Sequence, residues 1–335
     1  MLKNKRYIST IASLILLGAS LATNAATDPT AKNRVFSTDS FWYKPIPANA
    51  SLHPNSKNYT QEFLRQKKTY YGTVNINLTA YTSPVYYSNW YTPKTTVREW
   101  DCQRKGFFDA LLKESWTNVP IPLYAIPAKG SDAEMTIYDA ATDTLWEFWR
   151  MRKTTTGTWE ACWGGRIKGA RSNQGTFNTY YGTTATSLPF IGGQITAEEL
   201  AAGEIKHVMG ISLVDIEKKT IFSWPAQRSD GINPYNALHR IPEGARFRLD
   251  PTVNVDALPM SKAGKIIAKA AQQYGFVVWD RAGAISLRAQ NTYSYTQLGK
   301  PNPYPALFEG KQAYQVLNGF PWDKLQFMPM HYKAQ

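Results

Sequence analysis

Residues 145–166 read LWEFWRMRKTTTGTWEACWGGR and place four tryptophans, two glutamates and a cysteine in one short stretch. A polar turn, Lys153–Gly157, separates two segments in which apolar and polar side chains alternate. Because side chains two residues apart lie on one face of a strand, this alternation predicts a β-hairpin. Its first strand would place Glu147 beside Trp149 on one face, with Leu145 and Met151.

The composition of this hairpin suits the binding of a sugar. An indole ring offers a flat apolar surface to a pyranose, and charged side chains can hydrogen-bond its hydroxyl groups. We therefore take the substrate-binding candidates from the hairpin and the Gly- and Thr-rich stretch that follows it: Trp149, Trp163, Arg166, Tyr180 and Tyr181. A half-buried hairpin with solvated charges would show the same pattern, so both interpretations stay open at this point.

Before and after the hairpin, the sequence has the pattern of short strands separated by turns that contain Pro and Gly. Strands are expected within 73–97, 134–138, 204–214, 221–231, 242–251 and 276–280. Helices are expected at Tyr59–Lys68, from a capping box at Thr196 to Ala202, and at Lys262–Tyr274 before Gly275. This pattern predicts a mainly β fold, like a β-sandwich or jelly roll with a few helical insertions. One β-rich domain would span 41–330 and end in a wrapping C-terminal tail.

The N-terminus has the pattern of a secretory signal peptide. Three cationic residues precede an apolar run, Ile11–Ala22, that is too short to span a bilayer, and small residues follow it. We expect a signal peptide at 1–25, a flexible segment at 26–40, and export to the bacterial periplasm or the extracellular space. Cys102 and Cys162 are the chain's two cysteines, and in an oxidising compartment they are expected to form a disulfide.

The chain is basic, with a formal net charge of +13 at pH 7. Removal of residues 1–25, which carry three cationic and no acidic side chains, would leave +10. Such a charge favours an anionic partner, above all an acidic polysaccharide or an envelope glycan, and permits contact with a membrane surface. The basic residues form no run of five, which argues against nucleic acid. No CxxC, CxxH or HExxH motif occurs, so neither a metal nor a cofactor is expected.

Seven ordered motifs carry a resemblance to an uncharacterised family of exported bacterial proteins that is common in actinobacteria. They are WEFW, WGGR, GTTATSLPFIGGQI, EIKHVMGI, WPAQRSDG, IPEGARFRLDP and AAQQYGFVVWD, within about Phe41 to Leu325. The resemblance implies one exported single-domain unit. It implies no catalytic role for any residue, so the chemistry has to come from the residues themselves.

The catalytic candidates are Glu147, His207, Arg228 and Asp230. Each is in or just after an expected strand, and each neighbours aromatic or Gly-rich sequence. Glu147 with Asp230, or with Glu160, could form the acid and nucleophile pair of a glycoside hydrolase. No GxSxG, P-loop or dinucleotide motif offers an alternative chemistry.

A polysaccharide lyase is the second enzymatic hypothesis. An arginine, Arg228 or Arg166, would neutralise a uronate carboxylate while His207 or a tyrosine removed the C5 proton. Non-catalytic binding of a glycan or envelope component is the third. The hypotheses differ in one structural expectation: an enzyme requires the four catalytic candidates to line one cleft together with Trp149 and Tyr180.

Overall fold

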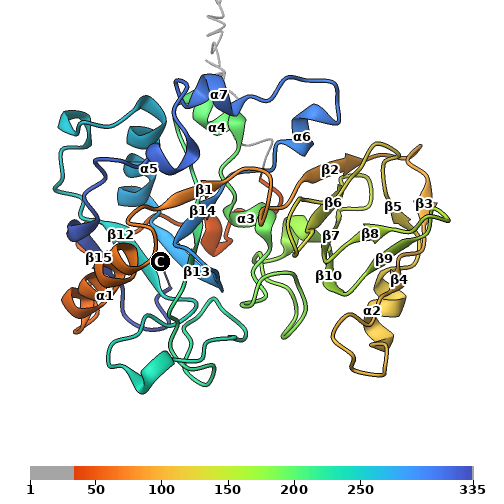
Figure 1. Cartoon of the computed structure of the whole chain (residues 1–335), viewed down its shortest axis with the longest axis horizontal. Coiled ribbons are helices and arrows are strands. Elements are labelled where there is room, and N and C mark those ends of the chain that lie inside the picture. The colour runs from red at the N-terminus through yellow and green to blue at the C-terminus, as the bar shows by residue number, and fades with distance from the viewer. Residues whose placement is uncertain (1–33, 334–335) are drawn as a thin grey trace, which may run out of the picture.

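The computed structural model describes residues 34–333, and the expected signal peptide lies outside them. The described chain forms two lobes side by side, with α3 between them (Figure 1). One lobe is built on a six-stranded sheet and the other on a four-stranded sheet with two small sheets. No helix among residues 34–333 is both long and apolar enough to cross a bilayer.

The six-stranded sheet mixes parallel and antiparallel pairs. Its strands, in spatial order, are β1 (Asn75–Asn77), β14 (Ser286–Arg288), β11 (Met209–Leu213), β13 (Phe276–Arg281), β12 (Arg246–Leu249) and β15 (Leu325–Phe327). Alternate side chains, such as Ile76, Leu287 and Ile211, enter the first hydrophobic core. The helices that accompany this lobe are α1 (Ser56–Thr69), α4 (Ala197–Ala202), α5 (Lys262–Gln273) and α7 (Tyr304–Leu307), whereas α6 (Tyr293–Thr296) lies between this lobe and β2 (Val85–Ser88) of the other (Figure 1).

The second lobe contains the predicted tryptophan hairpin. Its main sheet has the order β10 (Trp163–Lys168), β7 (Thr144–Trp149), β6 (Met135–Asp139) and β2 (Val85–Ser88). Two smaller sheets pair β3 (Lys94–Thr95) with β5 (Val119–Pro120), and β4 (Arg98–Glu99) with β9 (Trp159–Ala161) and β8 (Arg152–Lys153). The short helices α2 (Ala110–Ser115) and α3 (Phe190–Gly193) complete the lobe. The 3-10 helices among residues 34–333 are Phe41–Tyr43, Ala170–Ser172, Pro234–Asn236, Val255–Ala257, Ala313–Gln315 and Trp322–Lys324.

Strand β13 belongs to both hydrophobic cores. Phe276 and Val278 pack in the first core, whereas Val277 and Trp279 pack in the second. The Trp279 ring lies directly on Gly210, where a Cβ atom would come within 2.3 Å of it. This contact requires glycine, because any larger residue at 210 would displace the indole. The two hydrophobic cores therefore share strand β13 of the six-stranded sheet as a common wall.

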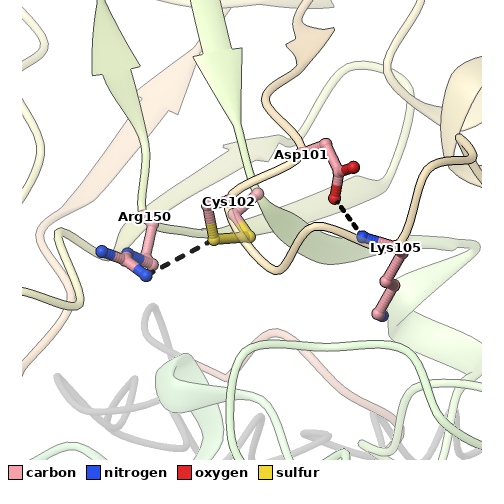
Figure 2. The surroundings of a disulfide bond; sticks show 5 residues. Asp101, Cys102, Lys105 and Arg150 are labelled. Atoms are coloured by element: carbon pink, nitrogen blue, oxygen red, sulfur yellow. Dashed lines mark hydrogen bonds between the residues drawn. A yellow bond between two sulfur atoms is a disulfide. The ribbon is translucent and has the colours of Figure 1, made fainter.

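The Cys102–Cys162 disulfide is present, as predicted. It joins the loop after β4 to the end of β9, and Arg150 Nη1 lies 3.5 Å from Cys102 Sγ (Figure 2). In the same loop, the Asp101 carboxylate accepts a hydrogen bond of 2.8 Å from the Lys105 backbone amide. The disulfide thus anchors the start of a loop, residues 101–109, that reaches the candidate site described below.

The β-rich character with helical insertions is confirmed, but a sandwich or jelly roll is not. Jelly rolls are antiparallel, whereas four strand pairs in this structure are parallel: β1 with β14, β11 with β13, β2 with β6, and β4 with β9. Residues 221–231 form no strand, and within 204–214 only Met209–Leu213 does. The described end of the segment predicted to be flexible is packed, because Val35 and Phe36 are buried in the second core.

The predicted helices have clear local causes. Thr196 and Glu199 form the capping box of α4, and Gly203 ends it in the left-handed conformation. Ser261 caps α5 through the Gly264 amide. Gly275, with a φ of 71°, follows α5 and leads the chain into β13.

Candidate functional site

The candidate site is a cleft formed by two adjoining cavities of about 720 and 700 Å³. We call the first the carboxylate pocket, after Glu134, Asp230 and Asp280 in its wall. The second is the tyrosine pocket, which is lined by Tyr71 and Tyr81 among others. Asp132 and Arg281 line both cavities, so the two are parts of one cleft.

Glu134 is the most unusual group of the carboxylate pocket. It immediately precedes β6, its exposed fraction is 1%, and its Oε2 has no hydrogen-bond partner among the described residues. Burial raises the pKa of Glu134 to about 8, although the charge of Arg288 acts in the opposite direction. The carboxyl group is therefore neutral at pH 7 and can donate a proton.

Asp280 reaches the same pocket from the end of β13. A register shift between β11 and β13 leaves Trp279 without a partner, so Asp280 pairs with Ser212. Such a bulge re-aims a side chain, and here Trp279 enters the second core while Asp280 lines the pocket. Asp280 accepts a hydrogen bond of 3.1 Å from Arg288 Nη2.

Asp280 differs from Glu134 in its protonation at neutral pH. Burial raises the pKa of Asp280 to about 6, and the charge of Arg288 limits the rise. Asp280 is therefore mainly ionised at pH 7 while Glu134 keeps its proton. The two carboxyl groups of the pocket thus differ in how far their pKa values are raised, and such a difference is the basis for a division of roles between acid and base.

Aromatic side chains form another part of the wall of the carboxylate pocket. Trp149 and Trp163, which are paired across β7 and β10, line it together with Tyr180. The Lys105 ammonium lies 4.2 Å from the centre of the Trp163 ring. The Tyr181 ring stacks on Trp163 at 5.8 Å, and its hydroxyl donates to Asp109. This wall therefore offers apolar surface and a cation side by side.

The loop after Pro225 contributes two of the predicted catalytic residues. Arg228 and Asp230 both line the carboxylate pocket. Arg228 donates to Ser187 Oγ and to the carbonyl groups of Gly182 and Thr184, so it holds the neighbouring loop in place. Asp230 pairs with Arg281 at 3.6 Å.

Glu147 lies outside the cleft walls, fully buried at the junction of the lobes. Its two oxygens accept hydrogen bonds from the backbone amides of Phe190 and Ile191 and from the hydroxyls of Thr136 and Thr183. Burial raises the pKa of Glu147 to about 7 even though these four donors lower it. Glu147 thus fastens the start of α3 to the four-stranded sheet.

His207 lies in a different place from the other three catalytic candidates. It is buried before β11, not on a sheet face, and its Nε2 is 3.2 Å from Glu199 of α4. Burial by itself lowers the pKa of His207, but the charge of Glu199 has a larger opposite effect. The pKa of His207 is therefore raised. The cavity beside the pair holds only about 20 Å³ and shares no wall residue with the cleft. We therefore assign His207 no role at the cleft.

The structure brings five of the nine predicted site residues together, but the four catalytic candidates do not line one cleft as expected, because Glu147 and His207 lie outside it. Arg228, Asp230, Trp149, Trp163 and Tyr180 line the carboxylate pocket. Arg166 pairs with Glu114 outside it, and Tyr181 lies behind Trp163. Glu134 and Asp280 were missed, although each stands at the end of an expected strand, a place where a side chain can leave the sheet for a cleft. That position was the signal that could have found them.

Comparison with models of protein families, with curated proteins and with solved structures finds no match for this chain. The resemblance to exported bacterial proteins therefore stays a prediction. The chemistry of the cleft has to be argued from its own residues.

Proposed function

We propose that this protein is an exported carbohydrate-active enzyme that hydrolyses an extracellular or cell-envelope polysaccharide. One observation carries the proposal: two carboxyl groups, the buried Glu134 and the half-buried Asp280, share an aromatic-walled cleft, and burial raises the pKa of Glu134 further than that of Asp280. A pair of carboxyl groups, one a proton donor and one ionised, is the equipment of most glycoside hydrolases. The disulfide agrees with the oxidising compartment that export provides.

In this proposal Glu134 acts as the general acid. It donates its proton to the glycosidic oxygen as the bond to the anomeric carbon breaks. Asp280 either adds to that carbon or takes a proton from the water that does, and water supplies the hydroxyl group of the new reducing end. The anomeric configuration of the first product, read by NMR, distinguishes these two routes.

The preferred substrate in this proposal is anionic. Lys105 is exposed beside Trp163, and Arg281 stands where the two pockets meet. Both can contact a uronate or another acidic group while the rings of Trp149 and Tyr180 contact the sugar. The net charge of +10 that remains after removal of residues 1–25 would also concentrate an acidic polymer near the surface, an effect that salt screens.

The test is a screen of the purified mature protein against neutral and acidic polysaccharides. Release of reducing ends without the absorbance of an unsaturated product supports hydrolysis, and both signals together support a lyase instead. Glu134→Gln and Asp280→Asn should each abolish turnover. Glu160→Gln is the matched control. Glu160, on β9, pairs with Arg152 on β8 and lines neither pocket of the cleft. Salt-dependent glycan binding with no turnover would replace the enzyme proposal with the binding hypothesis.

A further inference from the structure

The tyrosine pocket has no part in the chemistry proposed above, yet it is as large as the carboxylate pocket. It continues the cleft beyond Asp132 and Arg281. Arg288, which donates to Asp280, is part of its wall. The two carboxyl groups therefore lie near the boundary between the pockets, with space for a ligand on either side of them.

The floor of the tyrosine pocket is a polar face of the six-stranded sheet. Asn75 and Asn77 on β1 lie opposite Ser286 and Arg288 on β14, and these four residues line the pocket. Ile76 and Leu287, which alternate with them, enter the first core on the other face. An edge of the sheet thus presents a row of amide, hydroxyl and guanidinium groups to the cleft.

The strand register extends this polar row to Asp280. Asn75 pairs with Ser286, Ser286 with Ser212, and Ser212 with Asp280. Four neighbouring strands therefore contribute hydrogen-bonding side chains to one line across the sheet. Asn75, Ser286 and Asp280 line the cleft, whereas Ser212 is fully buried beneath it and lines neither pocket. A row of such groups suits a ligand that carries hydroxyl groups along its length.

Two tyrosines flank this floor. Tyr71 and Tyr81 have φ angles of 66° and 58°, in the left-handed region that residues with side chains rarely adopt. Their exposed fractions are 82% and 42%, so each ring keeps surface free for a ligand. The Tyr81 ring packs close to Gly130, where a Cβ atom would lie 3.1 Å from it. Strained backbone of this kind clusters at ligand-binding sites.

We propose that the tyrosine pocket binds sugar units of the same glycan chain, on the far side of the scissile bond from the carboxylate pocket. The enzyme then cuts within chains and does not remove units from their ends. Each cut adds water across an internal glycosidic bond: a hydrogen goes to the leaving oxygen and a hydroxyl group to the anomeric carbon. This inference rests on the proposed function and specifies how the glycan chain lies across the two pockets.

The first experiment uses oligosaccharides of graded length, prepared from a polysaccharide that the native enzyme degrades. kcat/KM should rise with chain length, and the first products should be of intermediate size. Tyr71→Ala and Tyr81→Ala should lower kcat/KM on long chains by at least about tenfold and lower it less on the shortest cleaved substrate. Tyr91→Ala, which removes an exposed ring that does not line either pocket, is the control. Products of one or two units only, or tyrosine variants that behave like the control, would overturn the inference.

A second readout separates this inference from the proposed function. Binding to Glu134→Gln of oligosaccharides of graded length, prepared by partial acid hydrolysis of a uronic-acid polysaccharide and measured by calorimetry, requires no turnover. If no polysaccharide is hydrolysed but affinity rises with chain length and Tyr81→Ala removes that rise, the extended glycan site stands and catalysis fails. If the affinity does not depend on length, the tyrosine pocket is not a glycan site, whether or not the native enzyme is active.

Discussion

Replacement of Glu134 by Gln should make the protein more stable at alkaline pH. Burial raises the pKa of Glu134 from 4.5 to about 8. Between these values the folded protein keeps a proton that the unfolded chain has released, so its stability falls as the pH rises through that window. Each pKa unit corresponds to about 1.4 kcal/mol, which sets an upper limit of ~5 kcal/mol for the loss above pH 8. Gln cannot ionise and removes this loss.

The measurement is urea unfolding of native protein and Glu134→Gln at pH 5 and pH 9, followed by tryptophan fluorescence. The other buried carboxyl groups contribute equally to both proteins, so they cancel in the difference. We expect the variant to gain several kcal/mol relative to the native protein between the two pH values. If the difference in free energy of unfolding between the two proteins is the same at both pH values, the reasoning is refuted. Glu134 would then be hydrated or paired as an anion.

Three further predictions concern groups outside the catalytic proposal. Replacing Cys102 and Cys162 with Ser should lower the free energy of unfolding by ~4 kcal/mol, the chain-entropy value for a loop of this length; thiols that react with an alkylating agent in unreduced native protein would contradict the disulfide. Glu147→Ala should destabilise the fold by ~3 kcal/mol, since it leaves buried amides unpaired; an unchanged melting temperature would exclude that role. The His207–Glu199 pair should stabilise the native protein fully between pH 4.5 and pH 6.5, and should lose this contribution as the pH rises past the raised pKa of His207 or falls past the lowered pKa of Glu199; identical pH–stability curves for native protein and His207→Ala would argue against it.

The elements predicted correctly are those with local signals. Helix α5 follows from Ser261, an apolar stripe and Gly275, all within one short segment. The alternation of apolar and polar residues correctly predicts the hairpin. It also predicts that the first strand continues past Trp149, which is wrong. In the structure Arg150 has a φ of 53°, and the strand stops there and resumes as β8. A break of this kind leaves no trace in a pattern of apolar and polar residues.

The candidate site was harder to predict because it depends on contacts between distant segments. The hairpin was expected to carry Glu147 and Trp149 on one face, but the sequence could not show that α3 would cover the carboxylate and leave the indole beside the cleft. Glu134 and Asp280 are far apart in the chain and meet only because β6 and β13 belong to adjoining lobes. Their raised pKa values arise from burial, which appears only in the folded chain.

The shared strand β13 has a consequence for how the protein unfolds. Loss of the six-stranded sheet would remove Val277 and Trp279 from the second core, and loss of the four-stranded sheet would expose the same two side chains. Neither lobe can therefore melt while the other stays intact, and calorimetry should record one cooperative transition. For the same reason, a fragment that carries only one lobe should not fold when it is expressed alone.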